Sequence, residues 1–178
     1  MASAATALVT FAELEQMPDL PGDRWELHEG ELVRVPPPLH GHRLIQRIIQ
    51  RTLERSLGHR FQVEIELGFR TLDEHEYRVA DVAAMSSDRW RKVPRNGYIE
   101  GAPELVIEVI SPSNRAAVIR RTGDLCLANG CLQFWTVDPK RRTIQVRDRD
   151  GLEAEYGLGD QLSLPFGGEL MDVDAVFE

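Results

Sequence analysis

The chain has 178 residues, of which 42% are hydrophobic and 28% charged, and its formal net charge is −8. A chain of this length buries roughly 70% of the surface exposed by its unfolded form, and this composition is ordinary for a globular protein, so disorder, collagen and coiled coil are excluded as the main architecture. The two cysteines, Cys126 and Cys131, are too few for a disulfide scaffold.

The N-terminal segment has no Lys or Arg ahead of its short apolar run, and no stretch of the chain reaches the about 18 apolar residues of a membrane span. We therefore expect a cytoplasmic protein. A capping box at residues 10–13 predicts a short helix from Phe11. Residues 25–35 alternate apolar and polar around a turn at 29–30, which predicts two short strands.

Residues 41–57 form the clearest predicted helix, because their apolar residues recur at helical spacing. Arginines recur every four residues along the same segment, on one face. They are Arg43, Arg47, Arg51 and Arg55. This row, roughly 18 Å long at about 1.5 Å per residue, could follow a phosphate backbone, with Gln46 beside it. The favoured interpretation is a solvated face with acids nearby, such as Glu54.

The remaining segments alternate between strand and helix patterns. The predicted strands are 61–71, 77–85, 104–110, 132–137 and 142–149, and the predicted helices are a short one at 86–92 and a longer one from 111–114 to 128. A loop is expected at 93–101, and short strands or loops with a final turn at 172–177 are expected in the tail. Strands on both sides of a strand–helix–strand unit predict an α/β or α+β fold with a mixed sheet.

Asp81 and Glu108 are each a lone carboxylate inside a run that otherwise reads as buried strand. Burying an unpaired charge costs several kcal/mol, so such an acid usually has a partner. Two carboxylates from neighbouring strands would suit Mg²⁺ or Mn²⁺. The alternative is that each acid pairs with an arginine or lies where its strand reaches water, and composition alone favours this alternative. The five histidines and two cysteines show no zinc-binding pattern.

Several segments resemble the putative restriction endonuclease family, a bacterial branch of the PD-(D/E)xK nuclease superfamily. The most specific is GAPELVIEVISPSN at 101–114, followed by NGCLQFWTVDP at 129–139. The weaker matches are RWELHEGELVRV at 24–35, HGHRLIQRI at 40–48 and RVADVAAM at 78–85. The resemblance implies a restriction endonuclease-like core of mixed sheet flanked by helices, here preceded by an N-terminal helix and hairpin.

We therefore expect one domain over residues 1–178, with its core at about 24–146 and C-terminal strands and a turn at 147–178. The resemblance also implies a catalytic site in which Asp81 and Glu108 bind Mg²⁺ or Mn²⁺ and Glu26 assists. The implied substrate is DNA, cut by hydrolysis of phosphodiester bonds. A homodimer is expected, because homodimers are the commonest oligomers.

The lysine of the superfamily site is missing from this chain. Its common position, two residues after Glu108, is Ile110, and its position on the following helix is Thr122. Arg120 and Arg121 are nearby and could contact phosphate, but arginine stays protonated and cannot act as a base. Two hypotheses remain open: a metal-dependent endonuclease that manages without this lysine, and a catalytically inactive nuclease fold that serves as a binding or scaffolding module.

Overall fold

The structure is a computed structural model that describes residues 8–18, 24–111, 116–167 and 169–178. Its helices are α1 (Phe11–Gln16), α2 (His40–Leu57), α3 (Ser87–Trp90), α4 (Ala116–Ala128) and α5 (Asp174–Phe177), with 3-10 turns η1 (Gly58–Arg60) and η2 (Pro165–Gly167). Its strands are β1 (Arg24–His28), β2 (Glu31–Val35), β3 (Phe61–Arg70), β4 (Tyr77–Ser86), β5 (Ile99–Glu100), β6 (Leu105–Val109), β7 (Gln133–Asp138), β8 (Thr143–Asp148), β9 (Glu153–Tyr156), β10 (Gln161–Ser163) and β11 (Leu170–Asp172).

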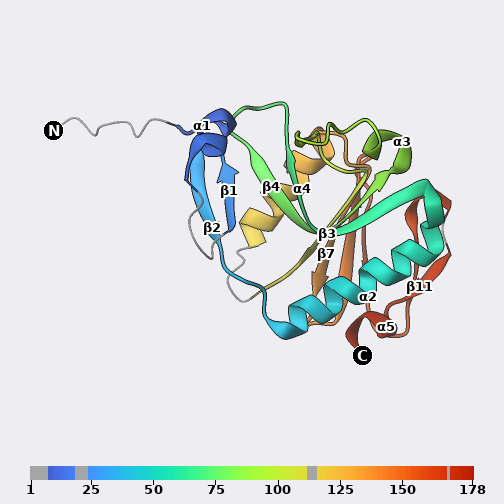
Figure 1. Cartoon of the computed structure of the whole chain (residues 1–178). Coiled ribbons are helices and arrows are strands. Elements are labelled where there is room, and N and C mark those ends of the chain that lie inside the picture. The colour runs from blue at the N-terminus through green and yellow to red at the C-terminus, as the bar shows by residue number, and fades with distance from the viewer. Residues whose placement is uncertain (1–7, 19–23, 112–115, 168) are drawn as a thin grey trace.

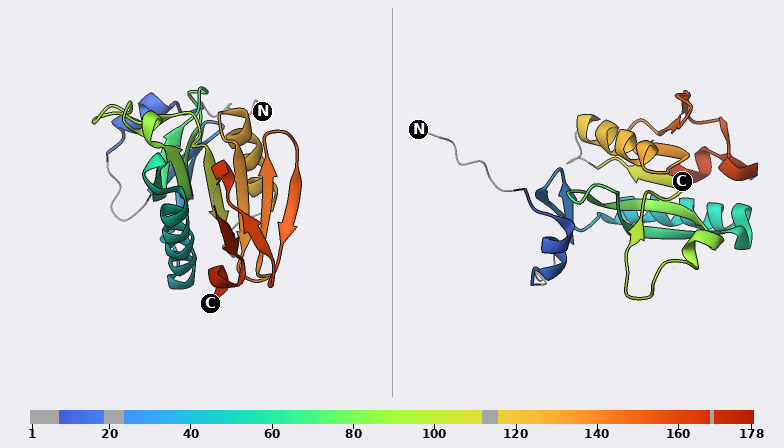
Figure 2. Two further views of the ribbon diagram at one scale, coloured as in Figure 1. Left: turned by 90° about the vertical axis from the view of Figure 1, so that its right-hand side faces the viewer. Right: turned by 90° about the horizontal axis from the view of Figure 1, so that it is seen from above.

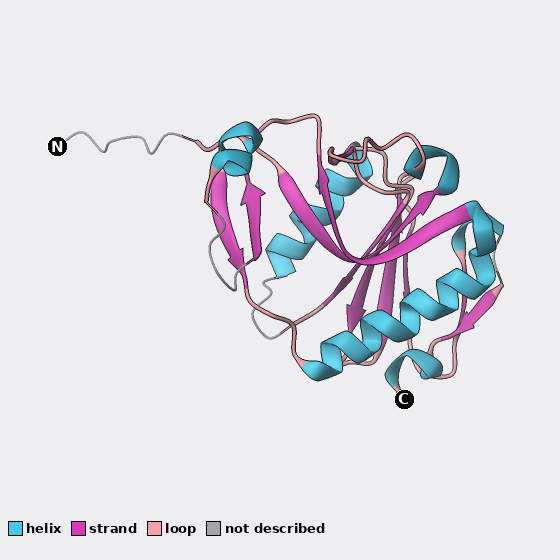
Figure 3. Ribbon diagram, viewed as in Figure 1, coloured by secondary structure: helices cyan, strands magenta, loops and turns pink. Residues whose placement is uncertain are grey.

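One mixed sheet of nine strands forms the centre of the molecule (Figure 1). Its main path runs β2-β1-β4-β6-β7-β8-β9, and β3 pairs with β4 and β5 beside this path. β6 and β7 are parallel and are joined through α4, whereas β3 and β4 form a long antiparallel hairpin. β3 is strongly curved along its length (Figure 3).

Two helices cover opposite faces of this sheet (Figure 2). The apolar side of α2, including Ile49 and Leu53, packs in one core with Ile107 and Trp135. The apolar side of α4, including Cys126, packs in a second core with Phe134. The sheet is therefore buried on both faces, which explains why β6 reads as a nearly continuous apolar run.

The C-terminal segment belongs to the core on the α2 side. Leu162 and Met171, from the β10–β11 hairpin, and Val176 of α5 are buried there. Among the described residues, we find no helix that is long and apolar enough to span a membrane.

The predicted elements recur with small shifts in their ends. The capping box of α1 is formed, with Thr10 accepting from the Glu13 backbone and Glu13 from the Thr10 backbone. The expected loop at 93–101 is wrong in one detail, because Ile99–Glu100 pairs in parallel with the end of β3. The expected start of the helix at 111–114 lies largely outside the described residues.

Candidate active site

A break in strand pairing on β4 makes room for the site. One edge of β4 pairs with β3 along nearly its whole length. Its other edge pairs first with β1, at Tyr77, and then with β6, from Val82 onward. The intervening stretch, which includes Arg78 and Asp81, has no strand partner on that edge among the described pairings. Side chains from several elements converge at this gap.

Asp81 is buried at the centre of this convergence. Its Oδ2 accepts a hydrogen bond from the backbone N–H of Val109, at 2.7 Å, which fixes the carboxylate against β6. Its Oδ1 accepts from Gln46 Nε2 at 3.0 Å and lies 2.9 Å from His42 Nε2. Gln46 and His42 are one helical turn apart on α2, so a single face of that helix supplies both.

Glu66 lies across from Asp81 in the β3–β4 hairpin, between the pairs Ile65↔Val82 and Leu67↔Ala80. Its backbone φ is 57°, in the left-handed region. Few residues other than glycine adopt this conformation, and it costs about 1–3 kcal/mol. The side chain of Glu66 accepts a hydrogen bond from Gln46 Nε2 at 2.6 Å.

At Glu66, the side chains of β3 switch from one face of the sheet to the other. Val63, before it, packs in the α2-side core, whereas Phe69, after it, packs in the α4-side core, although both positions are odd and would share one face of a regular strand. β4 shows the same change, because Ala80 packs on the α4 side and Val82 on the α2 side. The backbone distortion thus lies at the position where Glu66 and Asp81 meet.

Three of these side chains could share one cation. One ligand atom each from His42, Glu66 and Asp81 all lie within 4.8 Å of one another. The carboxylates of Glu66 and Asp81 lie on opposing strands and repel each other, so nearby donors or cations must offset this repulsion. Gln46 donates to both carboxylates, and Arg24 forms an ion pair with Glu66. Two carboxylates and an imidazole fit a divalent ion such as Mn²⁺, or Mg²⁺ with additional water ligands.

Glu108 is half-buried on β6, where it pairs with Thr136 of β7 and lies one residue beyond the part of β6 that pairs with β4. Its neighbour Val109 packs on the α2 side, so strand alternation directs Glu108 toward the α4 side. Burial raises the pKa of its carboxyl well above 4.5, and the nearby charges of Asp81 and Glu26 raise this pKa further. The guanidinium groups of Arg78 and Arg24 oppose these effects.

A second polar network links β1, β4 and α4. Arg78 is buried and forms an ion pair with Glu76 at 2.8 Å. Its Nη1 lies 2.8 Å from His28 Nδ1 and 3.4 Å from Thr122 Oγ1. A guanidinium can only donate, so His28 accepts at Nδ1 and donates from Nε2 to Glu26, at 2.6 Å. Arg78 thereby orients Glu26 through His28.

Residues 11–171 match the family described as Putative restriction endonuclease (Uma2). The chain belongs to this family. Its structure is similar to the crystal structure of a putative nuclease belonging to DUF820 from Anabaena variabilis, with a TM-score of 0.82 and 20% identity over 95% of this chain and 97% of that chain. None of the curated proteins matches the chain.

This membership in the putative restriction endonuclease family, which is a nuclease family, confirms the resemblance read from the sequence. The restriction endonuclease-like fold is confirmed as well, as a mixed sheet with flanking helices. The roles of individual site residues stay predictions. Asp81 and Glu26 are close enough to Glu108 for their charges to raise the pKa of its carboxyl.

Two further members of the cluster, Glu66 and His42, were not predicted as ligands. Glu66 belongs to a strand in which apolar and polar residues alternate, so a polar residue there is expected to face solvent. His42 precedes the apolar face of α2 and reads as a cap or a residue near the site. The signal that could have found Glu66 is its register opposite Asp81, but the sequence does not fix that register.

The predicted phosphate contacts separate into three groups. Gln46, predicted beside the arginine row as a possible phosphate contact, is buried and donates a hydrogen bond to Asp81. Arg120 and Arg121 are exposed and pair with acids, at 3.8 Å from Glu153 and 2.7 Å from Glu29 respectively. Arg43 and Arg47 are exposed.

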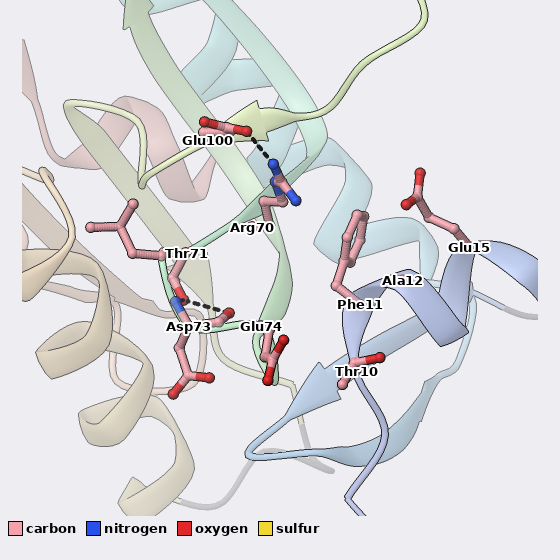
Figure 4. A pocket seen from close by; sticks show the side chains of 10 residues that line it. Thr10, Phe11, Ala12, Glu15, Arg70, Thr71, Asp73, Glu74 and Glu100 are labelled. Carbon is pink, nitrogen blue, oxygen red and sulfur yellow. Dashed lines mark hydrogen bonds and ion pairs between the residues drawn. The ribbon is translucent and has the colours of Figure 1, made fainter.

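The described residues line hollows that include one near α1 and one near α4. The larger, of about 250 Å³, lies between α1 and the end of the β3–β4 hairpin (Figure 4). Arg70 in its wall already pairs with Glu100 and lies over the Phe11 ring. The smaller hollow, of about 170 Å³, is lined by residues that include His28, Arg78 and Arg121 and therefore adjoins the second polar network.

Replacing Glu108 by glutamine is expected to stabilise the metal-free protein at neutral pH. A pKa raised on folding means that the stability contributed by Glu108 is present below pH 4.5 and is lost as the pH rises through the raised value. Glu108→Gln should therefore gain at least about 1 kcal/mol at pH 8, or about 2–4 °C in Tm, and less at pH 4. Thermal unfolding in EDTA at pH 8 and at pH 4 measures the change in Tm at each pH. An equal change at the two pH values would contradict this electrostatic origin.

Proposed function

We propose that the protein is a metal-dependent endonuclease that hydrolyses phosphodiester bonds of DNA at the His42–Glu66–Asp81 cluster. The observation that carries this proposal is the convergence of ligand atoms from these three residues within 4.8 Å, in a chain of a nuclease family. A divalent ion held there would activate water and stabilise the negative charge that develops on the phosphate.

The chain's own residues prepare the site for this reaction. Gln46 holds the carboxylates of Glu66 and Asp81 together, and the Val109 N–H fixes the second oxygen of Asp81. Such supporting hydrogen bonds orient ligands and typically change metal affinity or activity 10–100-fold when they are removed. Arg24 and Arg78 add positive charge beside the carboxylates, which favours an approaching phosphate.

Glu108 and Glu26 complete the proposed site on its α4 side. The raised pKa of Glu108 keeps more of its carboxyl protonated, and a divalent ion nearby would favour release of that proton. Glu26 has one oxygen bound to His28, and its side chain is 14% exposed, so it can still meet water. We assign Glu26 to the handling of this water or of a proton.

The second candidate function is an inactive nuclease fold that binds a partner. The observation in its favour is Thr122, a neutral and buried residue, at the place where the family resemblance implies a lysine. The two lysines of the chain, Lys92 and Lys140, are both exposed. Only a measurement of cleavage separates this candidate from the endonuclease.

The test is cleavage of supercoiled and single-stranded DNA by metal-free protein supplied with Mg²⁺, Mn²⁺ or EDTA. Cleavage is expected with either ion and not with EDTA. Glu66→Gln should lower the affinity for Mn²⁺, measured by calorimetry, and the cleavage rate, each at least about 10-fold. The matched control is Glu64→Gln, which removes a half-buried carboxylate from the same strand outside the cluster.

Two results would contradict the endonuclease. The first is native protein that binds Mn²⁺ but cuts neither DNA, which would favour the inactive module. The second is cleavage that Glu66→Gln and Glu64→Gln preserve equally, which would place the activity outside the cluster.

A further inference from the structure

The outer side of α2 carries a concentration of positive charge. Arg43, Arg47, Arg51 and Arg55 are all exposed, and Glu54 is the only acid on the helix. None of these arginines has an ion-pair partner among the residues that the structure describes. We call this set the α2 arginine row.

Several other exposed arginines of the chain form ion pairs with acids. Arg91 pairs with Asp88, Arg120 with Glu153 and Arg141 with Glu155. In a chain with a net charge of −8, acids are abundant, yet the arginine row has none in contact among the described side chains. The row is thus a solvated face, as the sequence favoured, but none of its arginines forms an ion pair with a described acid.

The row begins beside the proposed metal site. His42 and Gln46 reach Asp81 from the inner side of α2, and Arg43 and Arg47 directly follow them in the chain. From Arg43 the row continues for about 18 Å along the helix, at about 1.5 Å per residue. α2 lies at the outside of the molecule with one side open (Figure 1).

We propose that the α2 arginine row binds the phosphate backbone of duplex DNA and leads it to the His42–Glu66–Asp81 cluster. This inference rests on the proposed function and names the surface that holds the substrate. Guanidinium groups bind phosphate through paired hydrogen bonds, and a duplex strand offers a charge about every 3.4 Å along its axis. Four arginines along one helix, none of them paired with an acid that the structure describes, suit such a partner.

The test measures binding without cleavage. The affinity for a fluorescently labelled 20-base-pair duplex is measured by anisotropy in EDTA, over about 50–200 mM NaCl. Arg51→Gln with Arg55→Gln changes the half of the row farther from the cluster. The dissociation constant at 100 mM salt should rise about 10-fold, and the slope of log affinity against log salt should fall by about 2, near 0.9 per lost phosphate contact.

The matched control is Arg95→Gln with Arg149→Gln, which makes the same change in net charge at exposed positions outside α2. The control should keep the native affinity and slope. Equal losses in the two double variants, or no binding of the duplex by the native protein, would overturn the proposal.

Failure of this inference differs from failure of the proposed function. If the native protein binds the duplex through the row but does not cut it with Mn²⁺, the result supports the binding surface and contradicts the endonuclease. If the native protein cuts DNA but the Arg51→Gln and Arg55→Gln double variant binds the duplex as tightly as the native chain, the result supports the endonuclease. It then contradicts the role of the row in binding.

Discussion

Asp81→Ala is expected to lower divalent-dependent DNA cleavage by at least about 1,000-fold, the equivalent of about 4 kcal/mol in the barrier. Asp81 joins the elements of the site, because it meets His42 and Gln46 of α2 and the Val109 N–H of β6. Its removal takes a ligand from the cluster and leaves Glu66 with His42 alone. The rate is measured on supercoiled DNA with Mn²⁺.

The same substitution leaves the buried Val109 N–H without its acceptor, which costs about 1–3 kcal/mol. Asp81→Asn separates this structural effect from the chemical one, since its amide oxygen can still accept from Val109 while the charge is lost. Both variants should be inactive, and Asp81→Asn should keep more of the native Tm. Native cleavage rates in folded Asp81→Asn would rule out a role for this carboxylate in holding the ion.

The sequence singled out Asp81 and Glu108 as candidate site residues because a charge is conspicuous inside an apolar strand. Each interrupts a run of residues that the structure buries on both faces of the sheet. Glu26 was less distinct, since β1 is only partly buried and polar residues are ordinary there. Its place near Glu108 came from the family resemblance rather than from the pattern of the strand.

Glu66 could not be found in this way because its environment depends on a backbone distortion. An alternating strand predicts that Glu66 shares a face with Glu64 and lies in solvent. The positive φ at Glu66 instead changes the face of the strand and turns the residue toward α2. A single carboxylate in a strand gives no sign of such a change, which needs the opposing strand and the helix to hold it.

The helix α2 illustrates the same limit. Its apolar side was predicted correctly from spacing, and Ile49 and Leu53 are buried as that spacing requires. The burial of residues at the edges of this apolar side could not be predicted from spacing, because it depends on which groups of the sheet lie beneath the helix. Gln46 is at such an edge, and it is buried because Asp81 and Glu66 provide acceptors for its amide.

Thr122→Lys is expected to destabilise the protein without restoring activity, although the family resemblance identifies this position as that of a missing lysine. Thr122 is buried, and its Oγ1 lies 3.4 Å from Arg78 Nη1. An ammonium group here would meet a guanidinium already paired with Glu76. A buried charge without its own partner should cost about 2–4 kcal/mol, which lowers Tm by about 4–16 °C at this chain length.

Thr122→Met provides the matched control, because it adds a side chain of comparable reach without a charge. It should lose less stability than Thr122→Lys, and the difference measures the cost of burying a second positive charge beside Arg78. A Thr122→Lys protein with native Tm and faster cleavage would show that the site accepts a second cation. The expected result would instead mean that the guanidinium of Arg78, which comes from β4 rather than from α4, already places a positive charge beside residue 122, so that a lysine at this position would require the removal of that arginine.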